Sequence, residues 1–316
     1  MKIVVVGAGA MGSLFGGLLA EAGNDVHLYD VWAEHVQAVN QNGLAIEREG
    51  KTRTIKITAT TNPKQIGPAE LVIIFVKSTR TRAAAETAQT IAGTDGTVMT
   101  LQNGMGNADV IAEFIPAKRI LAGTTSHGAT MLGAGHIRHA GIGPTTIGAW
   151  GDSEGGLQRT GKFADLFSRA SIETLAIEDV RSVIWNKLLI NIGINAVTAL
   201  TGIKNGQLLE LEVTRQLSRA AVTEAMAVAR AQGVDVYPDA VQRVFQVAEA
   251  TGANRSSMGQ DVDHRRQTEI STINGFIVRE AERLELEAPV NAALTALIET
   301  LQYHYQQDGA CAPGTG

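Results

Sequence analysis

The residues whose types and spacing most directly suggest chemistry lie between positions 185 and 195. Lys187, Asn191 and Asn195 recur every fourth residue in a stretch that is otherwise apolar. At 3.6 residues per turn, this spacing places the three side chains within about 80° on one face of a helix. A solvated surface stripe would show the same spacing. Apolar neighbours such as Ile184 and Leu188 favour a mostly buried helix instead, where a lysine needs a partner.

A partly buried ammonium group suits the reduction of a ketone. Hydride addition converts the carbonyl oxygen into an alkoxide, and a positioned ammonium can donate a proton as that charge develops. Partial burial lowers the pKa of a lysine toward the working pH. Two amides can orient a polar substrate without adding charge. Lys187 is therefore a candidate proton donor, with Asn191 and Asn195 as candidate substrate contacts.

A source of hydride is indicated near the N-terminus by a glycine motif after a β-rich run at 2–6. Gly7 permits a tight turn, Gly9 lets backbone N–H groups approach a pyrophosphate, and Gly12 lets helix and strand pack closely. The N-terminus of the following helix adds partial positive charge. A simple glycine-rich turn is the structural alternative, but the strand-turn-helix context favours a dinucleotide site. Its expected contacts are Gly7, Ala8, Gly9, Ala10, Met11 and Gly12.

Asp30 bears on the choice of cofactor, because it ends the second expected strand 23 residues after Gly7. A carboxylate there can accept hydrogen bonds from the adenosine ribose, whereas a 2′-phosphate would place two anions together. NADH is thereby favoured over NADPH. Arg48, Lys51 or a shifted loop could still meet a phosphate, and Asp30 could be an ordinary helix N-cap.

The order of the expected elements predicts two domains. In the first part, strands at 3–6 and 25–29 alternate with helices at 12–22 and 32–42. Glu49-Gly50 centres a hairpin, buried strands follow at 71–76 and 98–101 around a helix at 80–91, and 120–148 supplies later strands of the same sheet. Beyond about 178 glycine becomes sparse, and helical periodicities cover 180–200, 208–232, 238–250, 256–284 and 289–306.

This pattern predicts an α/β fold: a Rossmann doubly wound parallel sheet domain at 1–178, followed by an all-helical C-terminal domain at 179–316. The tail from about 308 is expected to be disordered. Ligands of doubly wound sheets bind at the carboxyl ends of the strands, so the active site is expected between the two domains.

Composition excludes several classes of function. The 316 residues carry a net charge of -5, which leaves no general basic field for nucleic acid or an anionic membrane. The single cysteine, Cys311, argues against disulfides and cysteine metal sites, and we expect no metal. The apolar runs at 2–6 and 188–200 are too short for a signal peptide and a membrane span, respectively. A soluble cytoplasmic protein acting on a small molecule is expected.

Four motifs occur together in order: the glycine motif, Gln102-Asn103-Gly104, Trp185-Asn186-Lys187, and Asn254-Arg255-Ser256-Ser257-Met258 with Thr268-Glu269-Ile270. Over nearly its whole length the chain resembles the ketopantoate reductase (2-dehydropantoate 2-reductase) family. The resemblance implies transfer of a hydride from NADPH or NADH to the 2-oxo group of ketopantoate. The product would be (R)-pantoate for pantothenate and coenzyme A synthesis, with Lys187 as the proton donor.

The resemblance also implies further site residues. Cofactor contacts would include Lys77, Asn103, Gly128 and Glu269, and substrate contacts Asn103, Lys187, Asn191, Asn195, Asn205, Asn254 and Ser257. Each has a structural alternative: Lys77 caps the sheet, Asn103 serves a turn, Asn254 and Ser257 start a helix, and Glu269 forms a surface ion pair with Arg265 or Arg266. His127, in the same loop as Gly128, is left unassigned.

One departure keeps other functions open. Many ketopantoate reductases carry a basic residue after the second strand and use NADPH, whereas this chain has Asp30 there. One alternative is therefore an NAD-dependent D-2-hydroxy acid dehydrogenase that acts on another branched or aromatic 2-oxo acid with the same lysine. An alternative of another class is a non-catalytic nucleotide-binding protein, because fold does not fix function. A homodimer formed through the helical half is a further hypothesis.

Overall fold

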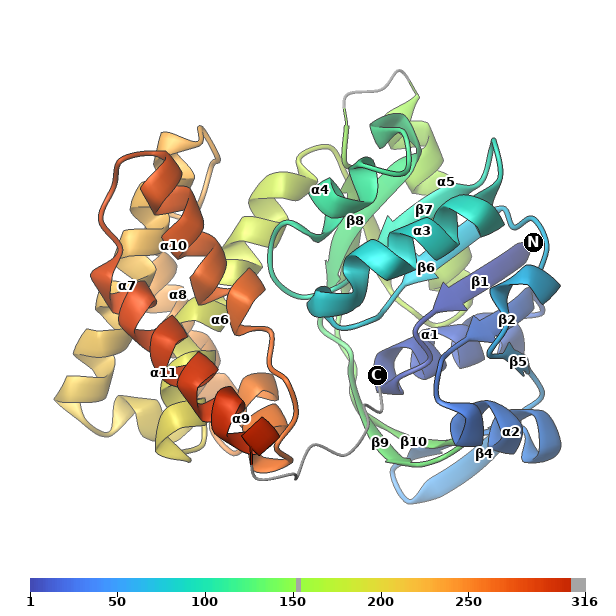
Figure 1. The fold of residues 1–316 in the computed structure, drawn as a ribbon, viewed down its shortest axis with the longest axis horizontal. Helices are drawn as coiled ribbons and strands as arrows, with labels where there is room; N and C mark the ends of the chain where they lie inside the picture. The colour runs from blue at the N-terminus through green and yellow to red at the C-terminus, as the bar shows by residue number, and fades with distance from the viewer. Residues whose placement is uncertain (152–154, 308–316) are drawn as a thin grey trace. The chain divides into compact units, whose positions relative to one another are not determined.

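Short apolar runs of the N-terminal half build an eight-stranded sheet (Figure 1). Its order is β12-β11-β8-β7-β6-β1-β2-β5, and every neighbouring pair is parallel except β11 and β8. The middle strands are almost wholly buried because helices cover both faces of such sheets. The predicted doubly wound parallel sheet is confirmed. The strands are β1 (Lys2–Val6), β2 (Asp25–Tyr29), β5 (Thr58–Thr60), β6 (Leu71–Ile74), β7 (Thr97–Thr100), β8 (Ile120–Thr125), β11 (Thr145–Ala149) and β12 (Thr174–Ile177).

The computed structural model describes residues 1–151 and 155–307. The tail from about 308, which the sequence predicts to be disordered, and Cys311 lie outside these residues. The chain divides into two units. The first contains Met1–Gln102 and Asn107–Val180, and the second contains Asn103–Gly106 and the helical region from Arg181. The turn at 103–106 therefore groups with the helices rather than with the strand that precedes it.

Helices of the first unit pack on the sheet through an aromatic core. Phe15, on the helix that follows the glycine motif, lies 4.9 Å from Phe75 and 5.9 Å from Phe167 between ring centroids. Buried aliphatic side chains of β1, β2, β6, β8 and β11 belong to the same core. The helices are α1 (Ala10–Glu21), α2 (Ala33–Asn42), α3 (Thr81–Ala92), α4 (Asn107–Ala112) and α5 (Gly156–Arg169), with short 3-10 turns η1 (Pro63–Gln65), η2 (Ser78–Arg80) and η3 (Ala117–Arg119).

A second, four-stranded sheet has the order β4-β3-β10-β9. The predicted hairpin joins β3 (Leu44–Arg48) to β4 (Lys51–Ile55), and Glu49 and Gly50 both have positive φ, as a tight two-residue turn requires. The prediction that all strands within 120–148 join the main sheet is wrong. β9 (Gly128–Gly133) folds back on β10 (His136–Gly141), which pairs with β3 instead. This small sheet covers α1 closely, since a Cβ at Gly17 would lie 2.8 Å from Ile46 Cδ1.

The second unit is helical, as predicted. Its long apolar helix α6 packs tightly against α7 and α8, because a Cβ at Gly193 would lie 2.6 Å from Val244 and 2.9 Å from Val222. The prediction of one helix over 256–284 is wrong. Arg265, with φ of 53°, interrupts it in the left-handed region. The elements are α6 (Val180–Thr201), η4 (Gly206–Leu209), α7 (Glu212–Ala231), α8 (Ala240–Ala250), α9 (Ser257–Asp263), η5 (Ile270–Thr272), α10 (Asn274–Arg283) and α11 (Pro289–Gln307).

Within the described residues, α6 alone has the length and apolar character of a membrane-spanning helix. It is longer than the apolar run at 188–200 seen in the sequence, because the helix begins at Val180. Of its most apolar 18-residue window, 61% is buried inside the protein. Core helices of globular proteins share these properties, so α6 is weak evidence for a membrane span.

Candidate active site

The glycine motif forms the turn between β1 and α1. Gly7 has φ of 94°, and a Cβ there would lie 2.7 Å from Val76 Cγ1. A Cβ at Gly12 would lie 1.9 Å from the Gly7 carbonyl oxygen. Only glycine fits these two positions. The first turn of α1 contains no acidic side chain, so its N–H groups and the helix dipole favour an anionic group such as a pyrophosphate.

Asp30 lies directly after β2 and is 4% exposed. Its Oδ2 accepts a hydrogen bond from the Ala8 N–H at 2.6 Å, and its Oδ1 accepts one from the Trp32 N–H at 2.8 Å. The carboxylate therefore ties the glycine turn to the start of α2. The N-cap of α2 is Trp32, so the alternative that Asp30 is an ordinary N-cap is wrong. Each carboxylate oxygen has a second lone pair that can accept a hydrogen bond from a ribose hydroxyl.

A buried hydrogen-bond chain supports the same turn, and sequence reasoning missed it. Gly135 N–H donates to His35 Nδ1 at 3.0 Å, so the neutral ring carries its proton on Nε2. Nε2 lies 3.2 Å from Ser13 Oγ, which donates to the Ala8 carbonyl at 2.8 Å. Burial lowers the pKa of His35, which favours this neutral form. No sequence signal links His35 to Gly135, because the two lie 100 residues apart.

Two other predicted cofactor contacts also belong to the first unit. Lys77 directly precedes η2 and lies three residues beyond the end of β6, and its role as a cofactor contact stays a prediction. Gly128 begins β9 and pairs with Gly141 of β10. Its neighbour His127 is buried, with Nδ1 at 3.1 Å from His139 Nε2. Burial lowers the pKa of both imidazoles.

The second unit brings Lys187, Glu269 and Asn103 together from distant parts of the chain. Burial lowers the pKa of Lys187 to about 8, although the negative charge of Glu269 acts in the opposite direction. Glu269 is 8% exposed, so the alternative of a surface ion pair is wrong. Its Oε2 accepts a hydrogen bond from Asn103 Nδ2 at 3.3 Å. The structure thus offers an ammonium group poised to lose a proton near neutral pH.

The turn that carries Asn103 is packed firmly onto the segment that follows Glu269. Met105 N–H donates to the Thr272 carbonyl at 3.0 Å. Gly104 has φ of 81°, and a Cβ there would lie 2.6 Å from the same carbonyl oxygen. Asn103 is therefore part of a turn, as the structural alternative holds, and its side chain also binds Glu269. This contact spans 166 residues, so no local pattern could have predicted it.

The predicted amides of the second unit include two buried polar atoms that lack a hydrogen-bond partner. Lys187, Asn191 and Asn195 share one face of α6, and none of the three is fully exposed, so the solvated-stripe alternative is not supported. Among the described residues, Asn195 Nδ2 and Asn205 Oδ1 are buried without a hydrogen-bond partner. Asn205 Nδ2 donates to Thr251 Oγ1 at 2.9 Å. Since buried polar groups are normally paired, a free donor and a free acceptor suit a polar substrate.

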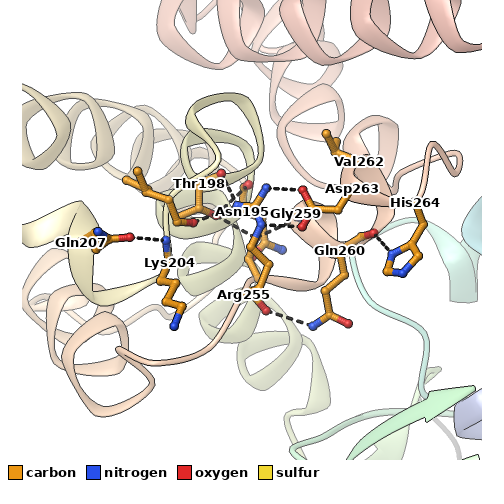
Figure 2. A network of polar contacts seen from close by, with 12 residues as sticks. Asn195, Thr198, Lys204, Gln207, Arg255, Gly259, Gln260, Val262, Asp263 and His264 are labelled. Carbon is orange, nitrogen blue, oxygen red and sulfur yellow. Dashed lines mark hydrogen bonds and ion pairs between the residues drawn. The ribbon is translucent and has the colours of Figure 1, made fainter. Parts of the chain in front are cut away.

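Asn254 is joined to Asn205 through the backbone, and Ser257 follows three residues later. The Asn254 carbonyl accepts a hydrogen bond from the Asn205 N–H at 3.0 Å, and Ser257 is the exposed first residue of α9. The helix cap is Ser256, whose Oγ accepts from the Gly259 N–H at 3.0 Å. Neither Asn254 nor Ser257 is therefore the N-cap of α9. Figure 2 shows the polar network around this segment, with Arg255 at its centre.

In residues 1–151 and 155–307, no three His, Cys, Asp or Glu side chains are grouped so that they could hold a metal ion.

Comparisons with known proteins agree along the chain. Residues 3–152 match the model of the family described as ketopantoate reductase PanE/ApbA, and residues 179–302 match its C-terminal model. A 2-dehydropantoate 2-reductase of Halobacterium salinarum is 39% identical, over 96% of this chain and 99% of its own length. One from Pyrococcus abyssi is 38% identical, over 95% and 97%.

Solved structures show the same relationship. A PanE/ApbA family ketopantoate reductase from Ralstonia eutropha superposes with a TM-score of 0.89 at 32% identity, over 97% of this chain and 100% of that one. D-mandelate dehydrogenase with NADH and anilino(oxo)acetate superposes with a TM-score of 0.90 at 28% identity, with the same coverage. With matches to both domain models and full-length relatives above 30% identity, the chain belongs to the ketopantoate reductase family.

Proposed function

We propose that this protein is a 2-dehydropantoate 2-reductase that converts ketopantoate into (R)-pantoate. The observation that carries the proposal is Lys187, a desolvated ammonium group with a pKa of about 8 beside the buried carboxylate of Glu269. Such a group can donate a proton near neutral pH. Full-length relatives named 2-dehydropantoate 2-reductase support the choice of substrate.

The bound nicotinamide would supply hydride to the 2-oxo carbon. We assign its binding to the turn of residues 7–12, with Asp30, Lys77, Asn103, Gly128 and Glu269 as further contacts. The glycine turn fits the group because its backbone can approach a pyrophosphate closely where side chains would collide. Asp30 favours NADH, since its carboxylate would repel a 2′-phosphate.

We assign proton donation to Lys187. As the carbonyl oxygen becomes an alkoxide, Lys187 Nζ donates its proton to that oxygen. Glu269 raises the pKa of Lys187 and so keeps more of it protonated before the reaction. The hydrogen bond from Asn103 Nδ2 orients Glu269 for this task.

Substrate binding is assigned to Asn103, Lys187, Asn191, Asn195, Asn205, Asn254 and Ser257. A 2-oxo acid with a hydroxyl group, such as ketopantoate, offers several acceptors and one hydroxyl donor. The free Asn195 Nδ2 donor and Asn205 Oδ1 acceptor complement both kinds of group.

A second candidate is an NAD-dependent D-2-hydroxy acid dehydrogenase that acts on a branched or aromatic 2-oxo acid. Two observations favour it: the buried carboxylate of Asp30 after β2, and the close superposition with a D-mandelate dehydrogenase that binds NADH. The candidate proton donor and amides argue against a non-catalytic nucleotide-binding protein. We also propose a cytoplasmic location and a homodimer, with no nucleic-acid or membrane partner.

The test is a matrix of substrates and cofactors. Ketopantoate, 2-oxoisovalerate and phenylglyoxylate are each assayed with NADH and with NADPH, and kcat/KM is compared. We expect ketopantoate to exceed the others by roughly tenfold or more, about 1.4 kcal/mol in transition-state binding. A preference for phenylglyoxylate with NADH would replace this proposal by the second candidate. Nucleotide binding without turnover of any 2-oxo acid would indicate a non-catalytic protein.

A further inference from the structure

A single guanidinium group joins α6, which carries Asn195, to α9, which carries Ser257. We define the proposed substrate wall as these two residues with Asn205 and Asn254. Arg255 Nε and Nη2 donate to the two carboxylate oxygens of Asp263, the last residue of α9, at 2.8 and 2.9 Å. Nη1 donates to the Thr198 carbonyl and, at 2.8 Å, to the Ile203 carbonyl. Figure 2 shows these bonds converging on Arg255.

The position of these acceptors gives the contact its strength. Thr198 lies in the last turn of α6, and Ile203 lies just beyond its end, where the helix dipole is negative. The Thr198 carbonyl also accepts a hydrogen bond from the Gly202 N–H at 3.0 Å, so Arg255 is its second donor. The bond pair to Asp263 is bidentate, which fixes orientation as well as distance. The Arg255 side chain is only 17% exposed, so water screens it less than it screens an ordinary surface arginine.

Gly259 provides the space for this group. A Cβ at Gly259 would lie 2.6 Å from Arg255 Cζ, 2.7 Å from Nη1 and 2.9 Å from Nε. Any side chain there would push the guanidinium out of its bonds. The Gly259 N–H also donates to Ser256 Oγ, which lies 2.7 Å from Thr198 Oγ. Gly259 and Arg255 therefore act as one unit at the junction of α6 and α9, because the guanidinium occupies the space that the glycine leaves.

We propose that Arg255, seated in the space left by Gly259, is a positioning residue that sets the affinity for the 2-oxo acid. It holds Ser257 and Asn254 in register with Asn195, three residues before Thr198. The inference rests on the proposed function. Lysine cannot replace it fully, because one ammonium cannot bind a carboxylate in two places and reach two carbonyls as well. Lys187 lies 11 residues before Thr198, about 16 Å along the helix, so its chemistry is unaffected.

The kinetic test compares Arg255→Met, Arg255→Lys and Gly259→Ala with wild type. Arg283→Met is the matched control, since Arg283 pairs with Glu280 in an exposed bridge on α10. We expect the KM for the preferred 2-oxo acid to rise at least tenfold in Arg255→Met and Gly259→Ala, and less in Arg255→Lys. In each variant the dissociation constants for NADH and NADPH should stay within about twofold of the wild-type values. The pH at which kcat declines should stay within about 0.3 pH unit of the wild-type value, which is on the order of assay error.

The double variant sharpens the test. With the guanidinium gone, the extra Cβ at 259 meets nothing of Arg255, so Arg255→Met with Gly259→Ala should raise KM no more than Arg255→Met alone. Gly259→Ala also keeps every charge, so it reports on geometry if Arg255→Met fails to fold. Additive increases in KM would overturn the proposal that the two residues act as one unit.

Hydrogen exchange provides a readout besides activity. The N–H groups of Asn205 and Gly206 bond to the Asn254 and Gly252 carbonyls, so both should exchange faster in Arg255→Met and Gly259→Ala, and not in Arg283→Met. Unchanged exchange, or unchanged KM in an active enzyme, refutes the positioning role alone. A wild-type protein that reduces no 2-oxo acid refutes the proposed function, and this role with it.

Discussion

Replacing Glu269 with glutamine tests the proton donor most directly. The pKa of Lys187 is lowered from 10.5 to about 8, mainly by burial, while Glu269 raises it. The net change corresponds to about 3 kcal/mol of lost preference for the protonated form. A partly solvated charge pair is worth about 1 to 2 kcal/mol, so removing the carboxylate charge should lower the pKa of Lys187 further, by about one pH unit.

The sign of the effect follows from the chemistry. Reduction needs the ammonium form, so kcat should be constant well below a pKa of about 8 and fall about tenfold per pH unit above it. In Glu269→Gln the decline should begin near pH 7, about one unit lower. With an ordinary lysine the decline would begin only above pH 10.

The assay is kcat at saturating substrate and cofactor between about pH 6 and 10. Glu282→Gln, which removes an exposed carboxylate on α10, is the matched control and should follow the wild type. If the wild-type and Glu269→Gln profiles coincide, Glu269 does not govern the proton on Lys187. If the wild-type rate is flat to pH 10, Lys187 is not the donor described here.

Three further substitutions test the proposed proton donor and the proposed cofactor site separately. Lys187→Ala should lower kcat by roughly 10² to 10⁴ with cofactor dissociation constants nearly unchanged, and a near-wild-type kcat would eliminate the proposed role. Asp30→Ala should weaken the binding of NADH more than the binding of NADPH in titrations. NADH loses an acceptor for its ribose hydroxyls, whereas for NADPH the removal of the carboxylate also relieves the repulsion of its 2′-phosphate; an equal loss of affinity for both cofactors would contradict this. Gly12→Ala should abolish cofactor binding, since its Cβ would lie 1.9 Å from the Gly7 carbonyl oxygen. Gly161→Ala, a helical glycine with open space around it, is its control and should bind normally.

Local patterns predicted the parts of the fold that local forces determine. The glycine turn, the hairpin at Glu49-Gly50 and the helix with Lys187, Asn191 and Asn195 each follow from spacing within a few turns of chain. The break after α9 was not predictable in this way, because Arg265 adopts a left-handed conformation with no glycine or proline to mark it. The second sheet was missed because the pairing of β10 with β3 joins segments about 90 residues apart.

The candidate site shows the same limit. Spacing alone placed the lysine and two amides on one helix face, whereas the bond between Asn103 and Glu269 depends on tertiary structure. Asn103 and Glu269 were predicted as site residues from the family resemblance and not from periodicity. The sequence showed Arg255 only as one position of a motif, because its acceptors lie on α6, just beyond the end of α6, and at the end of α9.

The buried imidazoles of the nucleotide-binding unit make its folding sensitive to acid. His35, His127 and His139 have pKa values lowered by burial from 6.5, so the folded unit keeps them neutral where an unfolded chain would already charge them. Unfolding below pH 6.5 therefore takes up protons, and each histidine subtracts stability as the pH falls from its unfolded value toward its lower folded one. Acidification should thus lower the stability of the unit that carries the glycine turn, even when every group that touches the cofactor keeps its charge.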